Sequence, residues 1–233
     1  MKARRRRIPG AIGLLWMLPV APATDAATPP AASELSARVE AATPDPQYGR
    51  ILYLKRCAGC HRPHAWGDGP REIPALAGQR ESYLIAQLVR FTSGQRPGSA
   101  MHGPAMYEAL QPGDVDRPQA FRDLTAYLAS IERNPHPEYG DGRALPAGAR
   151  AYAKGCAACH GEAGAGSDRG PTPRIAGQHF HYLLSRLRDF ETVHGGHGEA
   201  AAAGAGTPPT VAERQPIADY LSRLGEPGAD SPR

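Results

Sequence analysis

The stretch LKRCAGCHRP, residues 54–63, places two cysteines three positions apart and a histidine directly after the second. Residues 152–162, YAKGCAACHGE, repeat this arrangement. The 233-residue chain has four cysteines, and all of them lie in these two motifs: Cys57 and Cys60 with His61, and Cys156 and Cys159 with His160. An explanation of the motifs must therefore account for both cysteines and for the histidine at each site.

Several chemistries use paired cysteines, and they differ in whether they need the histidine. Disulfides and thioredoxin-like redox chemistry do not need it. A zinc ribbon usually places its cysteine pairs about 15–20 residues apart, whereas 96 positions separate Cys60 from Cys156, so zinc would require an unusual fold. Covalent haem attachment uses every position, because two thiols on one helical turn reach the two vinyl groups and the next residue offers its imidazole to the iron. The motifs predict two covalently bound haem c groups.

The similarity between the two sites extends beyond the motifs at a constant offset of 99 residues. Upstream, Gly49 corresponds to Gly148 and Tyr53 to Tyr152. Downstream, PALAGQRESYLIAQLVRF (74–91) matches PRIAGQHFHYLLSRLRDF (173–190), with Pro, Ala-Gly-Gln, Tyr-Leu, Leu and Phe in step. Such a fixed period indicates a tandem duplication.

Each copy carries apolar residues at helical spacing, which predicts an amphipathic helix with one buried face. The residues expected in the cores are Tyr83, Leu84, Leu88 and Phe91 in the first copy and Tyr182, Leu183, Leu187 and Phe190 in the second. A final helix is expected in each copy, over FRDLTAYLASI from Phe121 and over RQPIADYLSRL from Arg214. Strand-like alternation is nearly absent, so the fold class is predicted to be all-α.

The chain length suits two compact domains of about 100 residues each. A basic head, an apolar run from Ile8 to Val20 and the small residues Ala21 and Ala23 are typical of an export signal. An uncleaved anchor is the alternative, although a span needs about 20 apolar residues. We expect a signal peptide over 1–23, a flexible N-terminal segment over 24–45, domain 1 over 46–132, a Pro- and Gly-rich linker over 133–147, domain 2 over 148–225 and a C-terminal tail over 226–233.

The formal charge of +4 comes from the predicted signal, which contains five of the 27 basic residues. Without them, 22 basic residues face 23 acidic ones. The mature chain therefore shows no charge pattern for binding nucleic acid.

These features together resemble the di-haem cytochromes of the c4 type, over residues 48–225. The pattern that carries the resemblance is Gly-x-x-x-Tyr-x-x-x-Cys-x-x-Cys-His, then Pro-x-hydrophobic-Ala-Gly-Gln, then a Tyr-Leu helix. The resemblance implies two tandem class I cytochrome c domains, each wrapped around one covalently attached haem c, in a periplasmic protein that carries single electrons. It also implies that the carbonyls of Pro74 and Pro173 accept hydrogen bonds from Nδ1 of His61 and His160, which fixes the imidazole orientation.

The family usually uses methionine as the sixth iron ligand. Beyond the signal the chain has only Met101 and Met106, both between the Phe91 helix and the final helix of domain 1. Counting forward from Phe91 favours Met101, which we assign, and counting back from the final helix brings Met106 closer; His102 is a further alternative. The corresponding loop of domain 2 has no methionine, so His197 or His194 would bind the second iron, or its sixth position would be open.

Two classes of function follow from these sites. An electron carrier needs no catalytic residue, only two haems and redox partners such as a terminal oxidase or a dehydrogenase, either of which can be membrane-bound. A di-haem redox enzyme or enzyme subunit, with thiosulfate- or peroxide-type chemistry, would act at the second haem. There the charged residues Arg174, His179, His181, Arg186 and Arg188 could bind an anion, or they could form a solvated face. We predict the carrier and keep the enzyme as the alternative.

Overall fold

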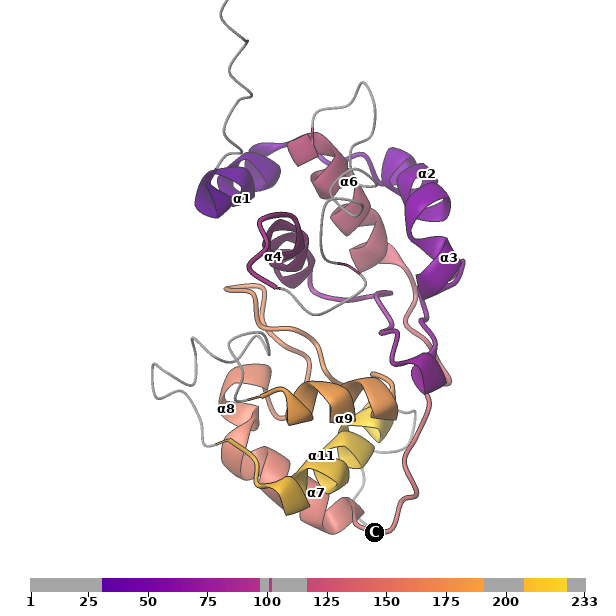
Figure 1. Cartoon of the computed structure of the whole chain (residues 1–233), viewed down its shortest axis with the longest axis vertical. Helices are drawn as coiled ribbons and strands as arrows, with labels where there is room; N and C mark the ends of the chain where they lie inside the picture. Colours follow the sequence, from indigo (N-terminus) through magenta and orange to yellow (C-terminus); the bar gives the residue numbers. More distant parts are fainter. Residues whose placement is uncertain (1–30, 97–100, 102–116, 191–207, 226–233) are drawn as a thin grey trace, which may run out of the picture.

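The computed structural model describes residues 31–96, 101, 117–190 and 208–225, which form two helical domains lying end to end (Figure 1). The first contains α1 (Ala32–Ala41), α2 (Pro46–Arg56), α3 (Ala58–His61), the 3-10 helix η1 (Gly69–Arg71), α4 (Glu81–Thr92) and α6 (Arg117–Ser130). The second contains α7 (Leu145–Gly155), α8 (Ala157–His160), α9 (Phe180–Arg188) and α11 (Val211–Arg223). In these ranges the only extended pairings are two isolated bridges, Asp68 with Ile73 and Ser167 with Thr172. The all-α prediction is confirmed.

Each domain is organised around one close crossing of its first and last long helices, α2 with α6 and α7 with α11. The crossings need glycine, because a β-carbon on Gly49 would lie 2.0 Å from the carbonyl oxygen of Asp123 and one on Gly148 would lie 2.1 Å from that of Pro216. Beside each crossing two tyrosine rings pack, Tyr53 with Tyr127 at 5.7 Å and Tyr152 with Tyr220 at 5.8 Å between centroids. The glycines and tyrosines repeated in the sequence thus build the same crossing twice.

The predicted flexible segment 24–45 contains a helix instead. Within it α1 packs against α4 and α6, and its residues Leu35 and Val39 are buried in the core of domain 1. The prediction was wrong because two apolar residues four positions apart, in an alanine-rich stretch, are enough to anchor a short helix when the rest of the domain offers a surface for it to cover.

The predicted core leucines are buried as expected, with Leu84 and Leu88 in domain 1 and Leu183 and Leu187 in domain 2. The two tyrosines that the same pattern predicted in the cores lie elsewhere. Tyr83 and Tyr182 lie near Arg96, whose guanidinium is 3.5 Å from the Tyr182 hydroxyl, so this pair belongs to the boundary between the domains.

The linker runs along the second domain before α7 begins. The carboxylate of Asp219, on α11, accepts a hydrogen bond from the Gly142 amide at 2.6 Å, and Arg223 donates to the Gly140 carbonyl at 2.7 Å. Since α7 starts at Leu145, the predicted domain boundary at residue 148 lies three residues too late.

The predicted signal peptide 1–23 and tail 226–233 lie outside the described residues. None of the helices that are described is long and apolar enough to cross a membrane.

Candidate haem sites

The first cysteine motif lies at the junction of two helices, α2 and α3. Asp45 caps α2, accepting hydrogen bonds from the amides of Gln47 and Tyr48 at 3.0 and 3.1 Å, as short acidic side chains do at helix starts. The helix ends at Arg56, with Cys57 as its C-cap, and α3 carries the motif onward. Cys57 is half-buried against the core, Cys60 is exposed and His61 is buried. Cys57 and the imidazole thus lie toward the interior, whereas Cys60 lies at the surface.

The second motif has the same arrangement. Cys156 follows α7 and is half-buried, Cys159 is exposed, and His160 at the end of α8 is buried. The predicted cysteines and histidine of each motif are therefore brought together on one turn, twice.

The two histidines are held in a single tautomer by backbone carbonyls. Nδ1 of His61 lies 3.0 Å from the Pro74 carbonyl oxygen, and Nδ1 of His160 lies 3.0 Å from that of Pro173. A carbonyl only accepts, so Nδ1 carries the hydrogen. Burial lowers the pKa of both imidazoles, which favours the neutral form with a lone pair on Nε2. Each histidine is thus prepared to bind a metal through Nε2, and the predicted proline contacts are confirmed.

The chain reverses direction directly after each histidine, and a buried tyrosine holds the turn. Arg62 and Gly161 both have positive φ, 66° and 77°. Their carbonyls accept hydrogen bonds from the hydroxyls of Tyr53 and Tyr152. This explains why the tyrosine four positions before each first cysteine is repeated.

The first thiol of each motif is not activated for redox exchange. Burial, followed by the charge of Cys60, raises the pKa of Cys57 to about 12, and burial with Cys159 raises the pKa of Cys156 to about 11. Thioredoxin-like chemistry needs the opposite shift.

The residues the structure describes also contain no group of three or more His, Cys, Asp or Glu side chains arranged for a bare metal ion.

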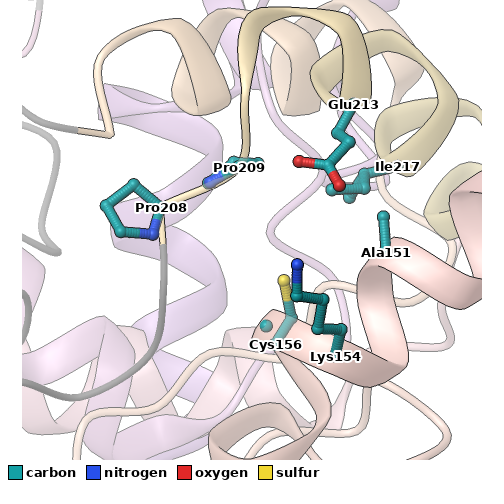
Figure 2. A pocket seen from close by; sticks show the side chains of 8 residues that line it. Ala151, Lys154, Cys156, Pro208, Pro209, Glu213 and Ile217 are labelled. Carbon is teal, nitrogen blue, oxygen red and sulfur yellow. The ribbon is translucent and has the colours of Figure 1, made fainter.

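An open pocket lies directly against the second motif (Figure 2). It lies between the end of α7 and the start of α11, and the side chains of Cys156, Lys154 and Glu213 point into it. Apolar residues, among them Ile217 and Pro209, also line it. A planar apolar group joined to Cys156 would find a partly apolar wall here.

A second feature of the domain boundary is the half-buried Arg174, whose Nε has no hydrogen-bond partner. Burial, then the charges of Arg133 and Arg80, lower the Arg174 pKa, and the charge of Asp168 opposes them. Such a positively charged region suits an anion, and the propionates of a haem are carboxylates.

The other predicted site residues fall into two groups. Met101 lies partly buried in a turn, whereas Met106, His102, His194 and His197 lie outside the described residues.

The anion cluster considered for domain 2 is not formed as such. Nε2 of His179 lies 2.6 Å from the Trp66 carbonyl and Nδ1 accepts from the Glu138 amide at 3.0 Å. His181 pairs with Glu138, and Arg186 pairs with Asp189 at 3.3 Å. The two histidines thus connect domain 2 to domain 1 and to the linker, whereas the Arg186 pair lies within domain 2.

Sequence reasoning missed the role of Gln79 and Gln178. Both are buried at the domain boundary, where each contacts the other domain. The available signal was a polar residue repeated in both copies of an otherwise apolar motif.

Comparison with known proteins agrees with this geometry. Cytochrome c4 of Azotobacter vinelandii is 33% identical over 144 residues, which are 58% of this chain and 67% of that protein. A thiosulfate dehydrogenase electron acceptor of Stutzerimonas stutzeri is 34% identical over 143 residues, 56% of this chain and 61% of that protein. The crystal structure of reduced cytochrome c4 from Pseudomonas stutzeri covers 78% of this chain and 100% of its own, with 25% identity and a TM-score of 0.61.

The sequence model of the family Cytochrome c matches the chain twice, over residues 46–132 and 146–225. The first range covers α2 to α6 and leaves out α1, the second covers α7 to α11 except Leu145, and together they contain both Cys-x-x-Cys-His turns. The chain therefore belongs to the cytochrome c family, as a tandem pair of cytochrome c domains similar to the di-haem cytochromes c4.

Proposed function

We propose that the chain is a periplasmic di-haem cytochrome that carries single electrons between redox proteins. The observation that carries the proposal is the duplicated site: in each domain two cysteines precede a buried histidine whose Nδ1 lies 3.0 Å from a proline carbonyl. The similarity to cytochromes c4 supports it. The export signal in the sequence supports the periplasmic location.

The residues have distinct roles in holding the two groups. Cys57 and Cys60 in domain 1, and Cys156 and Cys159 in domain 2, would form the thioether bonds. His61 and His160 would bind iron through Nε2, while the proline carbonyls keep the rings from turning. When bound, haem supplies the one-electron chemistry between ferric and ferrous iron. The protein supplies attachment, orientation and an apolar surrounding.

The two sites differ on the distal side of the iron. We assign Met101 as the sixth ligand in domain 1, with Met106 as the alternative. Domain 2 has no methionine, so His197 or His194 takes that role or the position is open. A thioether raises the reduction potential relative to a second imidazole, so a histidine ligand would make domain 2 the lower-potential site and give electron flow a direction.

The partners we propose are a dehydrogenase that donates electrons and a terminal oxidase, or another respiratory protein, that accepts them. One similar protein is named as the electron acceptor of a thiosulfate dehydrogenase, which makes a sulfur-oxidising donor the first to test. A membrane-bound partner would bring the chain to the membrane surface.

Spectroscopy of the purified protein tests the proposal. A pyridine haemochrome assay should give two c-type haems per chain. The ferric protein should show the near-infrared band of methionine-ligated haem, and the ferrous protein should not react with carbon monoxide. A protein that has no covalently bound haem after expression with a haem-attachment system would refute the proposal.

The enzyme alternative rests on the missing methionine of domain 2. An open iron there would bind carbon monoxide in about half of the haem, and it could act on a small substrate such as peroxide. Binding to half of the haem would therefore favour the enzyme, whereas no binding favours the carrier.

A further inference from the structure

Two equivalent glutamines make reciprocal contacts across the domain boundary. Gln178 of domain 2 accepts from the Ala75 amide at 2.9 Å and donates to the Ala75 carbonyl at 2.9 Å. Gln79 of domain 1 accepts from the Arg174 amide at 2.7 Å and donates to the Arg174 carbonyl at 2.9 Å. Because Gln79 and Ala75 correspond to Gln178 and Arg174 at the offset of 99 residues, the two contacts are the same contact made in both directions.

The backbone that each glutamine holds is the one that orients a histidine of the other domain. Ala75 directly follows Pro74, whose carbonyl oxygen lies 3.0 Å from Nδ1 of His61. Arg174 directly follows Pro173, which has the same relation to His160. The carbonyl that contacts each histidine and the amide N–H that contacts each glutamine therefore belong to the same peptide group.

The glutamine side chains are also fixed by burial and by contacts within their own domains. Both side chains are buried, at 8% and 7% exposure. Each side-chain oxygen accepts a second hydrogen bond, from the amide of the following residue, at 2.8 Å from Arg80 and 3.0 Å from His179. The amide groups are thus fixed from within their own domain before they reach across.

The remaining cross-boundary contacts are made elsewhere or differ between the two copies. Arg80 donates to the Ala165 carbonyl at 2.7 Å and pairs with Asp168, while its counterpart His179 lies against the Trp66 carbonyl. Ser82 donates to the Gly170 carbonyl at 3.0 Å. Among the residues that the structure describes, only the glutamines reach the backbone beside both prolines with the same geometry.

We propose that Gln79 and Gln178 are positioning residues that act in trans: each fixes the loop that orients the axial histidine of the other domain's haem. The proposal rests on haem attachment at His61 and His160. Partners of an axial histidine set its ring orientation and basicity, and thereby the properties of the metal. A change at one domain's glutamine therefore changes the reduction equilibrium of the haem in the other domain.

The test uses the di-haem holoprotein and two variants, Gln178→Leu and Gln79→Leu. Each replaces the amide by an apolar side chain of similar size and so removes the hydrogen bonds. In Gln178→Leu the Ala75 amide should exchange with deuterium about 2- to 10-fold faster, as expected for one lost hydrogen bond. The one-electron reduction equilibrium of the domain 1 haem should change about threefold, which is about 28 mV at 59 mV per tenfold. Gln79→Leu should produce the matching changes at Arg174 and in the domain 2 haem.

Each haem is followed separately through its hyperfine-shifted methyl resonances in the ferric protein, assigned by nuclear Overhauser contacts to side chains of its own domain. These shifts also report the orientation of the axial imidazole. Ser82→Ala is the matched control, because it removes one cross-boundary hydrogen bond that is not adjacent to Pro74 or Pro173. It should leave the methyl pattern of both haems unchanged.

A crossed pattern, with each variant affecting the opposite haem, supports the proposal. A shift in the haem of the variant's own domain, equal shifts in both haems, or the same shifts in Ser82→Ala would overturn it. Should Gln178→Leu fail to fold, Gln178→Glu tests the same contact, because it keeps the acceptor for the Ala75 amide and loses the donor. A normal count of two haems in these variants separates a failure of this inference from a failure of the proposed function.

Discussion

Gly49 lies so close to α6 that a β-carbon on it would stand 2.0 Å from the carbonyl oxygen of Asp123. Gly148 and Pro216 repeat the relation at 2.1 Å in the second domain. A backbone carbonyl cannot move aside as the end of a flexible side chain can. The crossing distance in both domains is therefore set by a glycine.

The first prediction is that Gly49→Ala destabilises domain 1. Forcing a methyl group into a close-packed contact costs about 1–3 kcal/mol, and the midpoint of urea-induced unfolding should fall accordingly. Gly59→Ala is the control, because nothing lies within 4 Å of its β-carbon and the corresponding residue of domain 2 is Ala158. If both substitutions lower the midpoint equally, the crossing does not depend on this contact.

The second prediction concerns the thioether cysteines. With Cys57→Ala and Cys60→Ala together, we expect the chain to bind one haem instead of two and domain 1 to lose most of its helix content. A domain of this size has a thin core without the apolar surface of the haem. Haem content by pyridine haemochrome and helicity by circular dichroism measure the two effects. The pair Cys156→Ala and Cys159→Ala should do the same to domain 2, and a native helical spectrum in either variant would contradict the coupling of haem and fold.

The sequence predicted where the two haem sites lie along the chain better than it predicted how the two domains contact each other. The two motifs, the offset of 99 residues and the proline contacts of His61 and His160 could all be read from spacing and resemblance. The contact between Gln178 and Ala75 could not, because residues 103 positions apart meet only through the packing of one domain on the other. The helix α1 was missed for a related reason: its stability comes from the surface of α4 and α6 that it covers, not from its own pattern.

The third prediction is a pH dependence of stability that comes from Tyr152. Burial, followed by the charges of Cys156 and Tyr220, raises its pKa to about 12, compared with about 10 in the unfolded chain. The folded protein therefore holds more protons between these values. Its contribution to stability is complete below pH 10 and is lost as pH rises toward 12.

Tyr152→Phe removes both the hydrogen bond to the Gly161 carbonyl and the titrating group. At pH 7 the variant should be less stable by about 1 kcal/mol, and the difference from the unaltered protein should shrink between pH 10 and 12. Urea unfolding at both ends of this window measures it. Tyr53→Phe, which removes the corresponding bond to Arg62, should behave alike, and a difference that stays constant with pH would contradict the shifted titration.

The fourth prediction assigns the sixth ligand of domain 1. Met101→Ala should abolish the near-infrared band of the ferric protein, because that band requires a bond between the methionine sulfur and the iron. The same change should make the ferrous domain 1 haem reactive toward carbon monoxide, since an alanine leaves the sixth position without a ligand. Visible and near-infrared spectra of the purified variant check both effects.

Met106→Ala is the matched control, because Met106 is the only other methionine beyond the predicted signal and lies five residues away in the same loop. The band should survive in this variant. Loss of the band in Met106→Ala alone would transfer the assignment to Met106, and a band that persists in both variants would mean that either methionine can bind the iron. Absence of the band from the unaltered protein would exclude methionine from the iron altogether. In that last case His102 becomes the ligand to test, and the difference in potential proposed between the two domains loses its chemical basis.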